Sequence, residues 1–252
     1  GAMLKLIINA DDLGLTPGCN DGILQAITEG IVTDTTILIN ADFAAQGIEM
    51  LKTRGIHQAG LHLNLTFGQP VSPADTVPSL VGPDGRFHHR AAKVLPVADR
   101  REAERELRAQ ITRFLSSGLT LNHLDSHHHI HSYPELLDMV VTLAQELGVP
   151  LRQTSPAVRD RIAGAGVAVT DHFSMGFYGA EVSVDMLKGI INSCRDGVLE
   201  IMCHPAAPDP ILPTVSSYSD CRGMELDILT NPIMKTFISE QNIRLISFSE
   251  LC

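Results

Sequence analysis

The chain has 252 residues, of which 44% are hydrophobic, and a formal net charge of −10. This composition is typical of a globular protein with a substantial core. The acidic charge argues against nucleic acid as a partner, because phosphates are bound by basic surfaces. No run approaches the ~18 apolar residues of a membrane span, and no charged segment followed by an apolar stretch opens the chain, so we expect a cytoplasmic protein without a membrane partner.

Cysteine usage agrees with a reducing compartment. The five cysteines are odd in number, widely spaced and without a CxxC pair: Cys19, Cys194, Cys203, Cys221 and Cys252. Such a pattern is typical of free thiols and not of a disulfide framework or a zinc ribbon. Gly1 and Ala2, ahead of Met3, resemble an expression remnant, so we expect a single domain over residues 3–252.

Apolar, strand-like runs alternate with helical patterns along most of the chain. Strands are predicted at residues 4–10, 36–39, 58–65, 119–124, 151–153, 167–169, 199–204 and 244–248. Helices are predicted at about 20–29, 41–53, 100–116, 135–147, 184–195 and 226–240. A segment rich in proline and glycine, 68–96, is too long for an ordinary connection and indicates a functional loop or cap. The alternation predicts an α/β fold, a (β/α) barrel of about seven strands.

The segment HLDSHHHIH, His123 to His131, places five histidines and one aspartate in nine residues. Imidazoles beside a carboxylate are typical ligands of a divalent metal ion. Continuing the strand register puts His123, Asp125 and His127 on one face, at the carboxyl end of a strand and just ahead of a helix. Ligands of α/β proteins bind at such ends. The alternative is a histidine-rich, solvated loop.

Three other predicted strands end in residues of the same kind. The first ends in Asp11 and Asp12, and buried carboxylates need a metal, a substrate or a helix amide as partner. The third carries His62; a lone histidine in an apolar strand is usually a core residue, so His62 becomes a candidate ligand only together with the other strand ends. Another ends in Cys203 and His204, which cannot form a thiol–imidazole dyad because adjacent strand residues point to opposite faces.

A barrel would bring five of these side chains to one rim: Asp11, Asp12, His62, His127 and His204. Two imidazoles and one carboxylate leave metal positions open for water and substrate, which is the pattern of a catalytic site. The remaining acidic and basic groups are then available for proton transfer.

Five segments together resemble a known family. NADDLGLTPGCNDGI, GLHLNLTFGQPV, HLDSHHHIH, FSMGFYG and EIMCHPA are similar to the successive motifs of the YdjC-like carbohydrate deacetylases, which include chitooligosaccharide deacetylases, from about residue 4 to 249. The resemblance implies a distorted (β/α) barrel related to NodB-type polysaccharide deacetylases. It also implies removal of N-acetyl groups from amino sugars or chitooligosaccharides, a Mg²⁺ or Zn²⁺ cofactor, and a homodimer.

The resemblance also implies roles for individual residues. Asp12, His62 and His127 would hold the metal ion, which activates water. Asp11 would be the general base and His204 the general acid, with the reverse assignment of the two aspartates as the alternative.

Four further residues are candidates for supporting roles. Asp125 would fix an imidazole from behind. Arg152 matches an arginine position of the family and would either orient a carboxylate or form a surface ion pair. Phe177 and Tyr178, in FSMGFYG, are aromatic candidates for stacking on a sugar ring.

Two other functions compete with deacetylation. A barrel-type, metal-dependent phosphoesterase would carry an HxH pair on its first strand and basic residues for phosphate, whereas this chain has Asp11 and Asp12 there. A non-catalytic sugar-binding protein would release no acetate from any N-acetylated sugar, despite bound metal.

Overall fold

The computed structural model describes residues 3–251, so the expected remnant Gly1–Ala2 and Cys252 lie outside the described residues. Its strands all pair in parallel. They are β1 (Leu4–Leu13), β2 (Asp34–Ile37), β3 (Gln58–Leu63), β4 (Thr120–Ser126), β5 (His172–Ser174), β6 (Gly197–Cys203) and β7 (Arg244–Leu245).

The strand order is β4-β3-β2-β1-β6-β5, with β7 beside β1. One edge of β1 is shared by two neighbours, because β7 pairs with Lys5 and Leu6 and β2 pairs from Asn9 onward. β1 is therefore the centre of the sheet, and its side chains are almost all buried.

Between β4 and β5 the sheet is irregular. Leu151 forms an isolated bridge with Leu124 of β4, and its amide donates to the Ala168 carbonyl at 3.2 Å. The backbone thus curves round from β4 toward β5 without regular strands. The prediction of an α/β, distorted (β/α) barrel of about seven strands is confirmed, whereas the strands expected at 151–153 and 167–169 are wrong.

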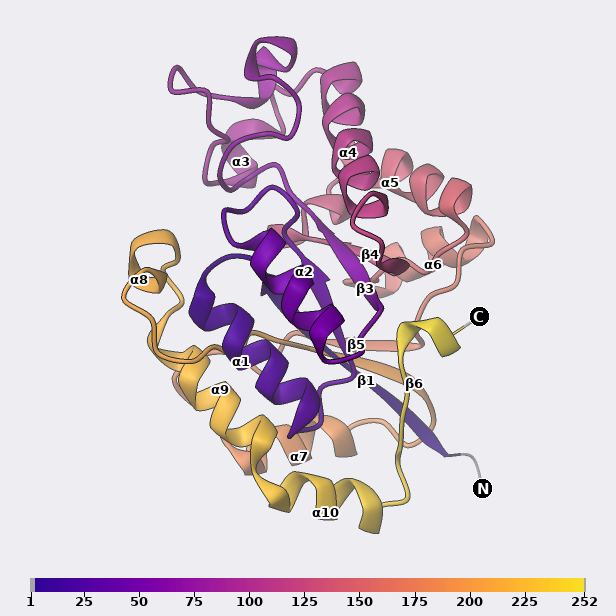
Figure 1. Ribbon diagram of the computed structural model, residues 1–252. Coiled ribbons are helices and arrows are strands. Elements are labelled where there is room, and N and C mark those ends of the chain that lie inside the picture. The colour runs from indigo at the N-terminus through magenta and orange to yellow at the C-terminus, as the bar shows by residue number, and fades with distance from the viewer. Residues whose placement is uncertain (1–2, 252) are drawn as a thin grey trace.

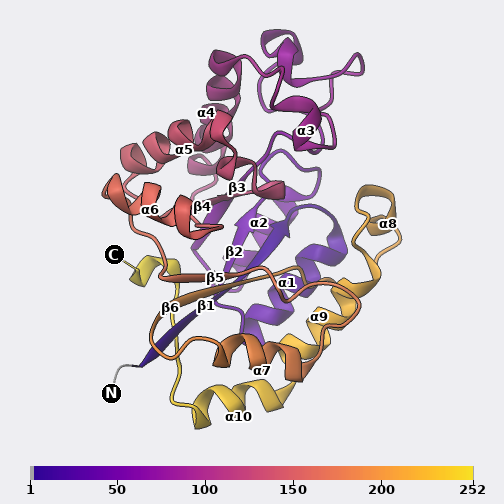
Figure 2. The same ribbon diagram turned by 180° about the vertical axis from the view of Figure 1, so that it is seen from behind.

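Helices cover the outside of the sheet (Figures 1 and 2). They are α1 (Pro17–Thr28), α2 (Ala44–Thr53), α3 (Ala91–Val94), α4 (Arg100–Leu115), α5 (Pro134–Leu147), α6 (Pro156–Gly164), α7 (Val184–Asn192), α8 (Leu212–Val215), α9 (Asp220–Thr230) and α10 (Pro232–Glu240). Short 3₁₀ turns are η1 (Ala74–Thr76), η2 (Pro78–Leu80), η3 (His127–Ser132) and η4 (Phe248–Glu250).

Local sequence signals set several helix ends. Thr16 caps α1 through a hydrogen bond from the Cys19 amide, with proline at the next position. Gly148 ends α5 in the left-handed conformation, at φ 64°. The helix predicted at 226–240 is divided at Asn231, because Pro232 lacks the N–H that a continuous helix requires; Asn231 caps α10 instead.

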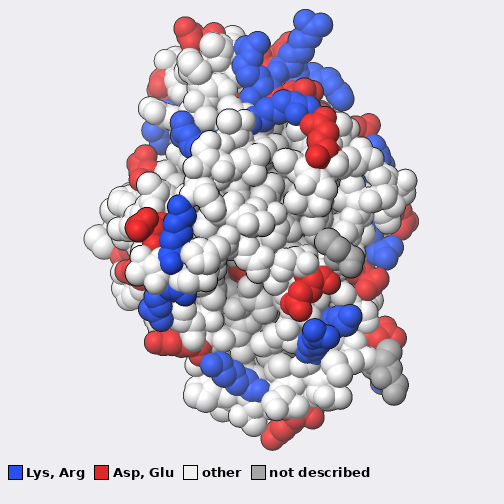
Figure 3. Space-filling model, turned by 45° about the vertical axis from the view of Figure 1, so that its right-hand side comes forward, with Lys and Arg blue, Asp and Glu red and all other residues white. Residues whose placement is uncertain are grey.

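One main hydrophobic core lies between the sheet and the surrounding helices, and extends from Leu4 to Ile238. Among residues 3–251, no helix has both the length and the apolar character needed to cross a membrane. The face in Figure 3 carries positive and negative side chains interspersed around an uncharged centre.

Candidate active site

The carboxyl ends of the strands open into a cavity of about 760 Å³. The segment between β3 and α4 borders one side through His89 and Arg90, and the loop after α8 borders the other. The remaining lining consists mainly of polar and aromatic side chains: Asp11, Asp12, His62, Thr66, Phe67, Ser126, His127, His128, His129, Tyr178, His204, Ser216, Tyr218 and Arg222.

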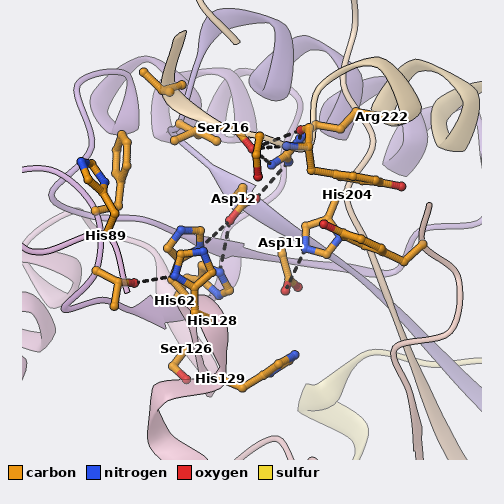
Figure 4. A pocket seen from close by; sticks show the side chains of 18 of the residues that line it. Asp11, Asp12, His62, His89, Ser126, His128, His129, His204, Ser216 and Arg222 are labelled. Atoms are coloured by element: carbon orange, nitrogen blue, oxygen red, sulfur yellow. Dashed lines mark hydrogen bonds and ion pairs between the residues drawn. The ribbon is translucent and has the colours of Figure 1, made fainter. Parts of the chain in front are cut away.

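The end of β1 separates the two aspartates. The pairing of β1 with β2 shifts register between Ala10 and Leu13, and Asp12 has a φ of 77°, which is uncommon for a residue other than glycine. Asp11 and Asp12 are 2% and 1% exposed, yet they contact different partners. Figure 4 shows Asp12 between Arg222 and His62, and Asp11 beside His204.

Asp12, His62 and His127 form one group of potential metal ligands, whose donor atoms lie within 4.8 Å of one another. Asp12 Oδ1 lies 3.2 Å from both His62 Nε2 and His127 Nδ1. This oxygen is buried and has no hydrogen-bond partner among the described residues. Two nitrogens and one unpartnered oxygen facing a common point fit a metal ion.

Asp125 orients one of these imidazoles. Its Oδ1 lies 2.7 Å from His62 Nδ1, so the ring presents Nε2 toward Asp12. Burial would lower the pKa of His62, but Asp125 and Asp12 outweigh it and raise the pKa to about 10. The negative charge around this ring therefore requires a positive charge, which either a proton or a metal ion can provide.

Arg152 links three buried carboxylates. Its side chain is 0% exposed and donates to both oxygens of Asp11, at 2.8 and 2.9 Å. It also donates to Glu200 Oε2 at 2.7 and 3.0 Å, and Nη2 lies 3.1 Å from Asp125 Oδ2. Burial would raise the pKa of Asp11, but Arg152 holds it below its usual value. Arg152 thus orients carboxylates in the interior, and the surface ion pair is excluded.

His204 lies on the other side of Asp11, with 3.7 Å between its Nε2 and Asp11 Oδ2. Burial lowers the pKa of His204 to about 4, although Asp11 and Asp12 oppose this effect. Its ring is therefore neutral at pH 7, with Nε2 beside the Asp11 carboxylate.

Of the five clustered histidines, His127 alone joins the group of potential ligands. His123 is buried and stacks on Phe248 at 3.7 Å. His131 is buried and its Nε2 lies 2.8 Å from the Arg152 carbonyl oxygen. His128 and His129 face the cavity, and both have positive φ. The chain turns directly after β4, with left-handed backbone at these two residues, so strand periodicity ceases to apply after Ser126.

The two aromatic candidates have different positions. Tyr178 is 47% exposed and lines the cavity. Phe177 is 0% exposed and packs in the hydrophobic core, so the expectation that it contacts a sugar is corrected. Phe177 and Tyr178 are adjacent in a loop between two glycines. The sequence alone cannot show which of the two rings packs into the core and which faces the cavity.

Four site residues have no counterpart in the sequence prediction: Glu200, Tyr218, Arg222 and Glu225. Arg222 Nη1 donates to Asp12 Oδ2 at 2.9 Å, and Glu225 accepts from the His204 amide at 2.7 Å. The available signal for Glu200 was a charged residue in the middle of an apolar strand, which needs a buried partner. α9 alternates polar and apolar residues without a motif, so nothing indicated Arg222 or Glu225.

Comparison with known proteins gives consistent matches over the whole chain. A family model described as YdjC-like protein matches residues 5–240. A carbohydrate deacetylase of Brevibacillus brevis (strain 47) is 42% identical over 253 residues, which cover 98% of this chain and 100% of that protein. A carbohydrate deacetylase of Geobacillus stearothermophilus is 38% identical, with 97% and 96% covered.

Solved structures extend the comparison to the fold. The crystal structure of an Enterococcus faecalis V583 protein, provisionally named a cellobiose-phosphate cleavage protein, has a TM-score of 0.94 at 34% identity and covers 100% of both chains. A family 4 carbohydrate esterase from Streptomyces lividans, in complex with acetate, has a TM-score of 0.51 at 12% identity, with 100% of this chain and 97% of that chain covered. The second likeness concerns the fold alone.

Proposed function

The chain belongs to the YdjC-like family, and from this membership and the geometry of its site we propose that it is a metal-dependent carbohydrate deacetylase that removes N-acetyl groups from amino sugars. The resemblance of the five sequence motifs to this family is thereby confirmed. The proposal is supported above all by one observation. One cavity is bordered by a group of potential metal ligands, by a carboxylate paired with an arginine, and by a partly exposed imidazole, which is the arrangement that hydrolysis of an amide needs.

A divalent cation held by Asp12, His62 and His127 would lower the pKa of a bound water and polarise the acetyl carbonyl. Side chains of the protein would carry out the proton transfers. Asp11 is ionised at neutral pH because Arg152 holds its pKa low, so it can accept the proton of the attacking water. Arg152 also fixes both oxygens of Asp11, so that the carboxylate keeps its orientation.

His204 delivers the proton to the departing amine, which is a poor leaving group without it. Because its ring is neutral before the reaction, the proton must arrive during the cycle. The gap of 3.7 Å between Asp11 Oδ2 and His204 Nε2 provides a short path for it. Water has then supplied the hydroxyl of acetate and one proton of the amine, and both residues regain their starting states.

The donor set favours Zn²⁺ over Mg²⁺, because Mg²⁺ prefers oxygen ligands whereas imidazole suits zinc. We expect metal analysis of the protein to find one divalent ion per chain, and chelation to abolish activity until the ion is restored. His127→Ala should weaken metal binding by more than the roughly 10- to 100-fold typical of an outer-shell partner. His57→Ala, an exposed histidine just before β3, is the matched control and should bind metal normally. Equal metal affinity of the two variants would contradict the ligand assignment.

The substrate class is tested by acetate release from N-acetylglucosamine, its phosphates and short chitooligosaccharides. Acetate release that depends on added metal is the expected result. Release of inorganic phosphate without acetate would instead favour the phosphoesterase alternative, and metal-dependent sugar binding without either product would favour a sugar-binding protein. Chitooligosaccharide specificity, a homodimer and a cytoplasmic location stay predictions; sedimentation of the purified chain tests the dimer.

A further inference from the structure

Two residues of α9 contact the site from one buried side of the helix. Arg222 and Glu225 lie about one helical turn apart, and are 3% and 0% exposed. Arg222 holds Asp12 Oδ2. Glu225 accepts from the His204 amide through Oε1 and from the Tyr218 hydroxyl through Oε2. Both oxygens of this buried carboxyl group thus have a donor, and loss of either donor would leave a buried oxygen without a hydrogen-bond partner.

Tyr218 extends this contact to the cavity wall. Its hydroxyl accepts from the Gly179 amide at 2.8 Å. Its ring stacks on Tyr178, with centroids 3.9 Å apart and planes at 14°. Both rings meet the His204 imidazole edge-on, at 5.7 and 6.0 Å. One face of Tyr178 is therefore covered by Tyr218, while the side chain remains 47% exposed.

Resting on the deacetylase function proposed above, we propose that Tyr218 and Glu225 form a brace that fixes the distance between Tyr178, on which a sugar ring stacks, and His204, which protonates the amide nitrogen. Within an N-acetylated sugar, covalent geometry fixes the distance from the ring face to that nitrogen. A fixed distance in the protein therefore selects which acetamido group reaches the proton donor. Tyr218 and Glu225 are positioning residues, because they act through Tyr178 and His204.

The test is a double-mutant cycle between Tyr218→Phe and Tyr178→Ala. Tyr218→Phe removes the hydroxyl and keeps the ring. Binding of di-N-acetylchitobiose is measured by calorimetry, and kcat and KM by acetate release. We expect Tyr218→Phe alone to raise Kd and KM by roughly 5-fold, the scale of one lost hydrogen bond. In the Tyr178→Ala background the same change should alter Kd by less than about 2-fold, because the brace then has no platform to hold.

Tyr133→Phe is the matched control, since Tyr133 is 41% exposed and does not line the cavity. It should leave Kd and KM unchanged. Thermal unfolding shows whether each variant is folded at the assay temperature. Should Tyr218→Phe be too unstable, Glu225→Gln replaces it in the cycle, because its amide oxygen still accepts from His204; a smaller, equally Tyr178-dependent rise in Kd is then expected.

The outcomes separate the brace from the proposed function. Effects on Kd that multiply independently of Tyr178 would overturn the brace and leave deacetylation intact. Coupled effects on sugar binding in a protein that releases no acetate would support the brace and overturn deacetylation. Absence of both sugar binding and acetate release would overturn the two together.

Discussion

Asp11→Asn will lower kcat by about 10²- to 10⁴-fold, the range for loss of a general base. Asparagine keeps the shape of the side chain and an acceptor for Arg152, but its amide cannot take a proton from water. The Asp12, His62 and His127 side chains are unchanged, so metal content should stay at the wild-type level. Steady-state kinetics combined with metal analysis of the same preparation checks both parts.

Asp75→Asn is a suitable control, because Asp75 is exposed and does not line the cavity. It should keep full activity. Two results would refute the assignment of the base in different ways. Activity retained in Asp11→Asn would remove Asp11 from proton transfer. Loss of metal from Asp11→Asn, with metal retained in Asp12→Asn, would reverse the roles of the two aspartates.

The second large effect concerns stability. Arg152→Met will lower the free energy of unfolding by about 3–5 kcal/mol, the range for breaking a buried ion pair from one side. Methionine fills much of the space, but it leaves Asp11, Asp125 and Glu200 buried without the guanidinium that contacts all three. Denaturant unfolding of metal-free protein measures the loss without a contribution from bound metal.

Arg108→Met provides the comparison at the surface. Arg108 also contacts two carboxylates, those of Glu104 and Glu146, but its side chain is 45% exposed. Exposed ion pairs contribute only about 0–1 kcal/mol, so this variant should be close to the wild type. If the two arginine variants lost similar stability, burial would not be what makes the Arg152 network important.

The fold could be predicted from the sequence where the residue patterns were regular. β1, β3 and β6 are mainly apolar and β4 mixes apolar and polar residues; all four end in chemically distinctive residues, and their parallel pairing brings those ends together. The irregular connection between β4 and β5 could not be predicted in the same way. Residues 167–169 are all apolar and residues 151–153 begin with a buried leucine, but both segments pair only through isolated backbone contacts where the chain curves from β4 toward β5. Local propensity does not encode that curvature.

The residues of the candidate site also fall into two groups, those that strand patterns predicted and those that they did not. Asp11, Asp12, His62 and His204 were found because strand ends meet at one rim, and Asp125 because it lies one register step before His127. Arg222 and Glu225 lie on a helix far along the chain from the first strand. They join the site only through tertiary contacts, with Asp12 and with the His204 amide. In the sequence alone, these two residues look like ordinary polar residues of a helix without a clear apolar face.

The contact between Arg222 and Asp12 spans 210 residues of sequence. During synthesis, therefore, Asp12 is completed long before the arginine that holds it, and β6 with His204 also follows late. When the first strand has just been synthesised, its two adjacent carboxylates still lack the imidazoles and the guanidiniums that contact them in the folded protein. Because β6, His204 and Arg222 all follow residue 196, the candidate site cannot be assembled until the chain has been synthesised beyond Arg222.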